Sequence, residues 1–87
     1  MRFLSKETWK APPTAEAQAL IPTELARVKE LKEQGMVEAL YVAADRSGAW
    51  MVWNVDSQAA LDEAHNTLPL HPYMNSEITE LAEEMLP

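Results

Sequence analysis

The order in which strand-like and helix-like segments alternate is the feature that most constrains the fold of this chain. The order is strand, helix, strand, strand, helix, strand, which is that of the ferredoxin-like split β-α-β motif. The whole pattern occupies 87 residues, a length near the lower limit for a self-sufficient hydrophobic core. We therefore predict a single α+β domain over residues 1–87, whose stability depends in part on association with other copies.

The N-terminal part contains one predicted strand and one predicted helix. Residues 1–9 alternate loosely and stop before two consecutive prolines, which cannot donate hydrogen bonds to a sheet. From Thr14, a suitable N-cap, the chain is rich in helix formers as far as Gly35, a typical residue just past a helix end. Pro22 lies inside this stretch and predicts either a kink or a second helix start.

The remaining segments complete the motif. Residues 36–44 and 49–55 are rich in Val, Trp, Tyr and Met, and the turn chemistry of residues 45–48 joins them into an antiparallel hairpin. A second helix is expected to start at residue 56 or 57 and to end near residue 66, and a fourth strand is expected over residues 73–79.

A sheet of this kind has one face covered by its helices and one face open. Several strand positions on both faces are apolar, so the open face needs a cover, and another copy of the same sheet is the simplest one. We expect a homodimer or a higher homo-oligomer.

Charge and composition exclude several kinds of partner. Seven basic residues face fourteen acidic ones, and the formal net charge of −7 would repel a nucleic-acid backbone. No signal-peptide core and no apolar run of membrane-spanning length is present, so we expect neither export by that route nor a membrane partner. The absence of cysteine rules out disulfides and thiolate chemistry and fits a cytoplasmic protein.

Common cofactor and metal motifs are missing as well. With two glycines, the chain has no glycine-rich phosphate loop and no nucleophile elbow. Two histidines and no EF-hand-like loop argue against a metal site. These absences disfavour a metal site and nucleotide-dependent or serine-hydrolase chemistry.

The segment Leu68-Pro69-Leu70-His71-Pro72-Tyr73-Met74 resembles the stretch before the last strand of the muconolactone isomerase family, in which an aromatic residue commonly occupies the position of His71. The likeness extends without gaps back to Gly35 and, with a shorter first loop, to Met1. The resemblance implies a dimeric α/β barrel in which two ferredoxin-like units pack sheet to sheet. It also implies a cofactor-free proton transfer within an unsaturated lactone, a reaction of aromatic compound catabolism.

Glu24 is the principal candidate for a catalytic residue. It lies three residues after Ile21 and four before Val28, within a stripe completed by Leu25 and Leu31. A carboxylate on that stripe is expected to be partly desolvated, with a raised pKa. By resemblance Glu24 lines up with the general base of the family. The alternative is a carboxylate at the edge of the stripe that pairs with a cation or caps the turn after Pro22.

The two histidines receive different interpretations. His71, at the start of the fourth strand, could donate a hydrogen bond to a substrate carbonyl or carboxylate, or could be a loop histidine that packs where the family has an aromatic residue. His65 is expected to be a border residue of the second helix without a chemical role.

A cleft between the sheet and its cover is expected to bind a flat unsaturated molecule. The predicted substrate-binding residues are Trp9, Tyr41, Ser47, Trp53 and Tyr73. Because strand residues alternate, Trp50 and Trp53 must face opposite ways. By resemblance, family members have polar or aromatic groups where this chain has Ser47 and Ala49, which argues against muconolactone itself and favours a different unsaturated small molecule, with a bulkier one as an option.

Three functions remain open at this point. The first is an isomerase or related lyase in which Glu24 is the base and His71 or Tyr73 polarises the substrate; it predicts a closed, mostly apolar pocket that reaches Glu24. The second is a non-catalytic small-ligand-binding or accessory protein on the same barrel, with Glu24 ion-paired or exposed. The third is a cofactor-independent monooxygenase, which oxygen uptake would reveal.

Overall fold

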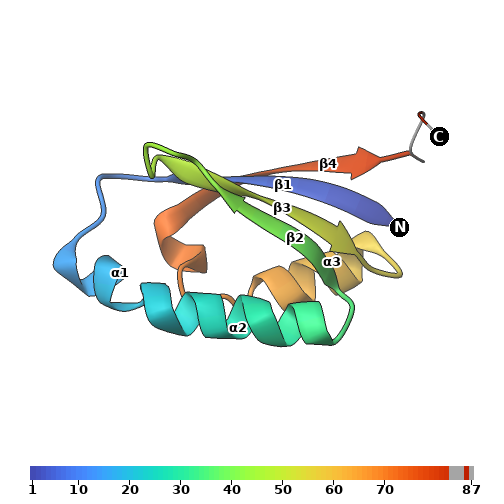
Figure 1. Cartoon of the computed structure of the whole chain (residues 1–87), viewed down its shortest axis with the longest axis horizontal. Coiled ribbons are helices and arrows are strands. Elements are labelled where there is room, and N and C mark those ends of the chain that lie inside the picture. Colours follow the sequence, from blue (N-terminus) through green and yellow to red (C-terminus); the bar gives the residue numbers. More distant parts are fainter. Residues whose placement is uncertain (83–85, 87) are drawn as a thin grey trace.

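The computed structural model describes residues 1–82 and 86, and the elements follow one another in the predicted order. They are β1 (Arg2–Trp9), α1 (Ala15–Ala19), α2 (Ile21–Glu33), β2 (Val37–Val42), β3 (Gly48–Asn54), α3 (Gln58–His65), a short 3-10 helix η1 (His71–Tyr73) and β4 (Met74–Leu81). The strands form one antiparallel sheet in the order β2-β3-β1-β4, and all helices lie on the same face of it (Figure 1). The α+β, ferredoxin-like fold class is thus confirmed. Within the described residues, every helix is too short or too polar to span a bilayer.

The helical segment of the N-terminal half is divided in two at Leu20. Thr14 caps α1 by accepting a hydrogen bond from the amide of Ala17 at 3.2 Å, as expected. Leu20 then serves as the C-cap of α1 and as the N-cap of α2. Pro22 occupies the first turn of α2, where a missing amide donor costs nothing. Of the two alternatives predicted at Pro22, the structure shows a second helix start and not a kink.

The apolar stripe of α2 reaches the core only along its C-terminal half. Val28 and Leu31 are buried, whereas Ile21 and Leu25 remain 37% and 48% exposed. The apolar stripe predicted from the sequence therefore does not face the core in this first part, because α2 diverges from the sheet toward its N-terminus (Figure 1). The space left between helix and sheet is the cavity described below.

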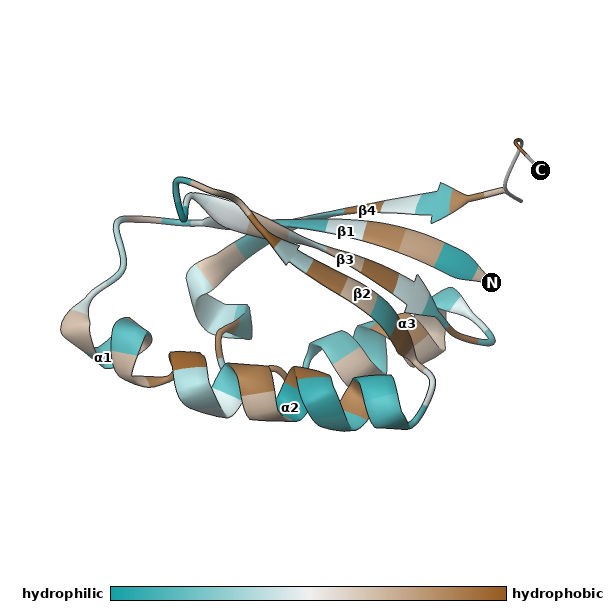
Figure 2. Cartoon of the chain, in the orientation of Figure 1, coloured by the Kyte–Doolittle hydropathy of each residue, from teal (hydrophilic) through white to brown (hydrophobic). Residues whose placement is uncertain are grey.

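The core lies between α2, α3 and the inner face of the sheet. Hydrophobic positions are seen in β2, in β3 and near the start of β1, and in α2 they alternate with hydrophilic positions (Figure 2). The buried cluster consists of Phe3, Val28, Leu31, Val37, Met51, Trp53, Val55, Leu61, Ala64 and Leu68. Trp53 is fully buried, and its indole donates a hydrogen bond of 2.9 Å to the hydroxyl of Ser5.

Gly48 and the turn before it determine the geometry of the β2–β3 hairpin, whose strands carry part of the site. At Gly48 a Cβ atom would lie 2.2 Å from the backbone oxygen of Glu7, so a side chain there would push β3 away from β1. In the preceding turn the carboxylate of Asp45 accepts hydrogen bonds from the amide and hydroxyl of Ser47, at 3.0 and 2.6 Å. Arg46 has a left-handed backbone conformation, with φ of 65°.

Candidate active site

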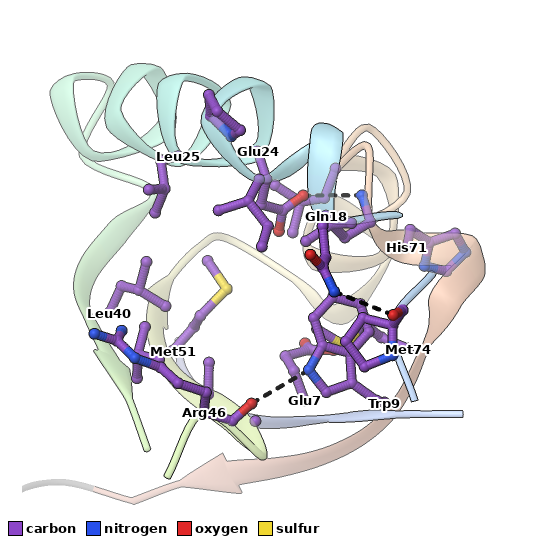
Figure 3. A pocket seen from close by; sticks show the side chains of 18 of the residues that line it. Glu7, Trp9, Gln18, Glu24, Leu25, Leu40, Arg46, Met51, His71 and Met74 are labelled. Atoms are coloured by element: carbon purple, nitrogen blue, oxygen red, sulfur yellow. Dashed lines mark hydrogen bonds between the residues drawn. The ribbon is translucent and has the colours of Figure 1, made fainter. Parts of the chain in front are cut away.

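A cavity of about 640 Å³ lies between the N-terminal part of α2 and the sheet. Its lining is mostly apolar, and polar side chains project into it from both sides. Leu25 and Glu24 approach it from α2, while Leu40, Met51, Glu7 and Trp9 approach it from the strands (Figure 3). The volume falls within the range of small-molecule binding sites.

Glu24 occupies the helix wall of this cavity. One oxygen of its carboxylate accepts a hydrogen bond of 3.0 Å from the backbone amide of Leu70 (Figure 3). Burial raises the pKa of Glu24, the Leu70 hydrogen bond opposes this, and the charges of Glu7 and His65 raise and lower it, respectively. The structure thus pairs this carboxylate with a backbone amide rather than with a cation. Its part in catalysis stays a prediction.

The anchor of Glu24 belongs to the segment that carries the family resemblance. After α3 the chain makes two consecutive turns, closed by hydrogen bonds from the amide of His71 to the carbonyl of Leu68 and from the amide of Tyr73 to the carbonyl of Leu70. Leu68 and Leu70 are both buried. The two turns place the Leu70 amide against α2, where its hydrogen-bond partner Glu24 is 46 residues away in sequence.

His71 also lines the cavity. Its ring packs edge-on against that of His65, with ring centroids 5.2 Å apart. In the described part of the chain, His71 Nδ1 is the one buried side-chain nitrogen or oxygen without a hydrogen-bond partner. Buried polar atoms are almost always paired, so this unpaired nitrogen beside the cavity is an exception to that rule.

Sequence reasoning missed a cluster of three polar side chains on the sheet side of the cavity. Glu7 Oε1 lies 2.6 Å from His65 Nε2, and Glu7 Oε2 accepts a hydrogen bond from the hydroxyl of Ser76. Glu7 and His65 are each only 6% exposed. The expectation that His65 is a border residue was wrong, because the inner face of β1 presents a carboxylate to it.

The ionisation of this cluster follows from its hydrogen bonds. Burial alone would raise the pKa of Glu7, but hydrogen bonds from His65, Ser76 and Ser5, together with the charge of His65, hold it below its ordinary value. The hydrogen bond to Glu7 raises the pKa of His65, against the effect of burial. The pair therefore favours a carboxylate and an imidazolium.

Of the five predicted substrate-binding residues, Trp9 lines the cavity. Its indole points toward the β2–β3 turn, where the carbonyl of Arg46 lies 3.4 Å away (Figure 3). The other four do not line this cavity: Trp53 is in the core, Tyr41 is 66% exposed, Ser47 is exposed in the turn, and Tyr73 is half-buried in η1. Trp50, as expected, faces away from Trp53 and pairs with Tyr41 across β2 and β3.

Comparison with known proteins identifies a matching family and several similar structures. The family model for muconolactone delta-isomerase matches residues 1–85, and no curated protein matches. The crystal structure of a muconolactone isomerase is 31% identical, with a TM-score of 0.83 over 98% of this chain and 92% of that one.

Two further solved structures share the fold at lower identity. The 5-chloro-2-hydroxyhydroquinone dehydrochlorinase TftG of Burkholderia phenoliruptrix AC1100, in complex with 2,5-dihydroxybenzoquinone, is 12% identical with a TM-score of 0.68, over 97% of this chain and 96% of that one. Rv0793 of Mycobacterium tuberculosis is 15% identical with a TM-score of 0.58, over 98% of each chain. From the match over residues 1–85 and the likeness at 31% identity, the chain belongs to the muconolactone delta-isomerase family.

Proposed function

We propose that this chain catalyses a cofactor-free proton transfer on an unsaturated small molecule such as a lactone, with Glu24 as the base. One observation carries the proposal: the Glu24 carboxylate is partly desolvated at the wall of an apolar cavity of about 640 Å³ and, among the residues that the structure describes, is hydrogen-bonded through one oxygen. The family supports an isomerase-like reaction. The cysteine-free sequence favours the cytoplasm as the compartment.

The chemistry needs one carboxylate that works in both directions. Glu24 takes a proton from a carbon next to the conjugated carbonyl, holds it, and returns it to another carbon of the same ring. Burial of Glu24 raises its pKa, so the carboxylate is a stronger base than a surface glutamate. The bond from the Leu70 amide fixes its position relative to the ring.

His71 is the second residue that we assign to the reaction. Its buried Nδ1 has no partner in the described residues, and its ring borders the cavity. A carbonyl oxygen of the substrate would give this nitrogen a hydrogen-bond partner and would be polarised in return. Trp9 is the aromatic surface that we assign to the flat ring of the substrate.

Proton exchange with solvent tests the proposed reaction. We expect muconolactone, or one member of a panel of larger unsaturated lactones, to isomerise or to exchange a ring-adjacent proton for deuterium in heavy water when the protein is added. Proton NMR follows both processes. Binding without exchange across the panel would favour the accessory-protein alternative, and oxygen consumption would favour a monooxygenase.

We also propose that a second copy of the chain covers the open face of the sheet. On this face Tyr41 and Trp50 are 66% and 37% exposed and lie opposite each other on neighbouring strands. Two β-sheets that pack face to face lie about 10 Å apart. The arrangement would give the dimeric barrel that the resemblance implies.

Replacing Trp50 with Glu is expected to weaken this dimer by about thirtyfold or more, because aromatic residues at the centre of an interface commonly contribute about 2 kcal/mol or more. Light scattering coupled to size-exclusion chromatography at several concentrations measures the change. The variant Trp50→Phe should remain dimeric. A wild-type protein that is monomeric at every concentration would disprove the proposed assembly.

A further inference from the structure

Three side chains that the proposed proton transfer does not use form a buried polar cluster on the opposite wall of the same cavity. Glu7 comes from β1, His65 from α3 and Ser76 from β4, so three elements converge there. The Glu7 carboxylate binds both other side chains, and Glu7 and His65 line the cavity together with Glu24. A substrate in the cavity would therefore lie between Glu24 and this cluster.

A contribution to stability is a weak explanation for a buried polar cluster of this kind. Apart from Ser5, which is hydrogen-bonded to Glu7 and to the Trp53 indole, its buried neighbours on the inner face of the sheet are apolar, namely Phe3, Met51 and Trp53. Replacing a buried ion pair with apolar residues of similar volume is often neutral or stabilising, because the charges lose their hydration. Such a pair at the wall of a cavity is therefore better explained by what it does to a ligand.

We propose that the Glu7–His65 pair stabilises the enolate oxygen that forms on the substrate when Glu24 removes a proton from carbon. The inference rests on the proposed proton transfer and narrows the substrate class to lactones and related carbonyl compounds that can form a conjugated enolate. His65 is the group that contacts the substrate oxygen. Glu7 is a positioning residue that orients the imidazole and holds its charge.

The chemical step balances without any other reactant. The carbon–hydrogen bond breaks, the proton passes to Glu24, and the electron pair moves through the conjugated system to the carbonyl oxygen. His65 keeps its proton throughout. Its Nε2–H is engaged by Glu7, and an imidazolium has a second donor at Nδ1 for the substrate. The enolate then collapses as Glu24 returns the proton to a different carbon.

The groups around His65 favour its charged form. Glu7 on β1 raises the pKa of His65 most, through its hydrogen bond, and the charges of Glu24 on α2 and Asp62 on α3 raise it further, while burial lowers it. His71 from η1 packs edge-on against the ring. An oxyanion site usually combines two donors, and His65 and His71 are neighbours at this wall.

Binding of an enolate mimic tests the inference independently of turnover. Tetronic acid is a five-membered lactone that is ionised as its enolate at neutral pH, butenolide is its neutral relative, and furoate is a flat carboxylate of similar size. We expect calorimetry to show that the wild-type protein binds tetronate at least about tenfold more tightly than butenolide or furoate, because a charged donor strengthens a hydrogen bond to an anion.

The comparison variant removes the whole cluster, as Glu7→Met with His65→Leu and Ser76→Ala. We expect it to remain folded by circular dichroism, to lose the tetronate preference while keeping its butenolide affinity, and to lose about 10²–10³-fold in kcat. An unchanged tetronate preference, or an equal loss for tetronate and butenolide, would overturn the inference.

A second variant keeps the test decisive if the triple variant does not fold. Glu7→Gln preserves side-chain size and removes the charge beside His65, so the alkaline limb of the pH–rate profile should move to lower pH, with a larger fall in kcat than rise in KM. A purely structural pair would lower the melting temperature and leave that limb in place. Glu24→Gln should retain the tetronate preference, so the failure of the proposed base and the failure of this pair give different results.

Discussion

Glu24→Gln is expected to lower kcat by about 10²–10⁴-fold, which is the usual contribution of a positioned general base. The carboxamide keeps the length of the side chain and keeps an oxygen to accept the hydrogen bond from Leu70, which is 3.0 Å long in the wild type. The segment around Leu70 should therefore stay in place, and what is lost is the ability to take up a proton. Steady-state turnover of the lactone identified by NMR measures the effect.

One companion variant and one stability measurement separate this loss from a general effect on α2. Glu33→Gln changes the same atoms on an exposed residue at the end of that helix and should have wild-type kcat/KM. Because burial disfavours the charged form of Glu24, the neutral Gln at position 24 should leave the melting temperature unchanged or higher. Wild-type turnover by Glu24→Gln would remove this residue from the mechanism.

The pH dependence of the wild type provides a second signature of the same group. A base must be deprotonated, so kcat/KM should fall as the pH drops through the pKa of Glu24, which lies above its ordinary value of 4.5. A charged His65 must stay protonated, so activity should fall again as the pH rises through its pKa, which lies above 6.5. The profile should be bell-shaped, and the residual activity of Glu24→Gln should lack the acidic limb.

The sequence was sufficient to predict the fold because its local signals agree with one another. The caps at Thr14 and Ser57, the turn at residues 45–48 and the position of Pro22 each set an element boundary through chemistry within a few residues. The divergence of α2 from the sheet could not be predicted in this way. Ile21 and Leu25 keep helical spacing with Val28, and only tertiary packing decides that the first two border a cavity.

In the candidate site, too, local sequence patterns predicted some features and tertiary packing decided others. The place of Glu24 on the apolar stripe predicted a partly desolvated carboxylate, and the structure shows one. Glu7 was missed, although period-two alternation from Phe3 through Ser5 places it on the inner face of β1. Its partner His65 lies 58 residues further along the chain, and no local pattern links two residues at that distance.

Trp53→Ala should produce the largest loss of stability, about 3–5 kcal/mol in the free energy of unfolding. Trp53 is fully buried and is the largest side chain of the core, so truncation leaves a cavity that the surrounding strands cannot fill. A domain of 87 residues has a total stability of about 4–13 kcal/mol, and each kcal/mol lost lowers the melting temperature by about 4–8 °C. Urea denaturation and thermal melts measure both quantities.

Two variants that are milder than Trp53→Ala, namely Trp53→Phe and Trp9→Phe, show which tryptophan contacts the substrate. Trp53→Phe removes the donor that binds the Ser5 hydroxyl at 2.9 Å, so it should lower the melting temperature and leave KM near the wild-type value. Trp9 borders the cavity, and its indole makes only a long contact of 3.4 Å to the Arg46 carbonyl. Trp9→Phe should therefore raise KM with little loss of stability. The reverse result would mean that the core tryptophan reaches the substrate through a rearrangement of β3, and that the cavity between α2 and the sheet is not the binding site.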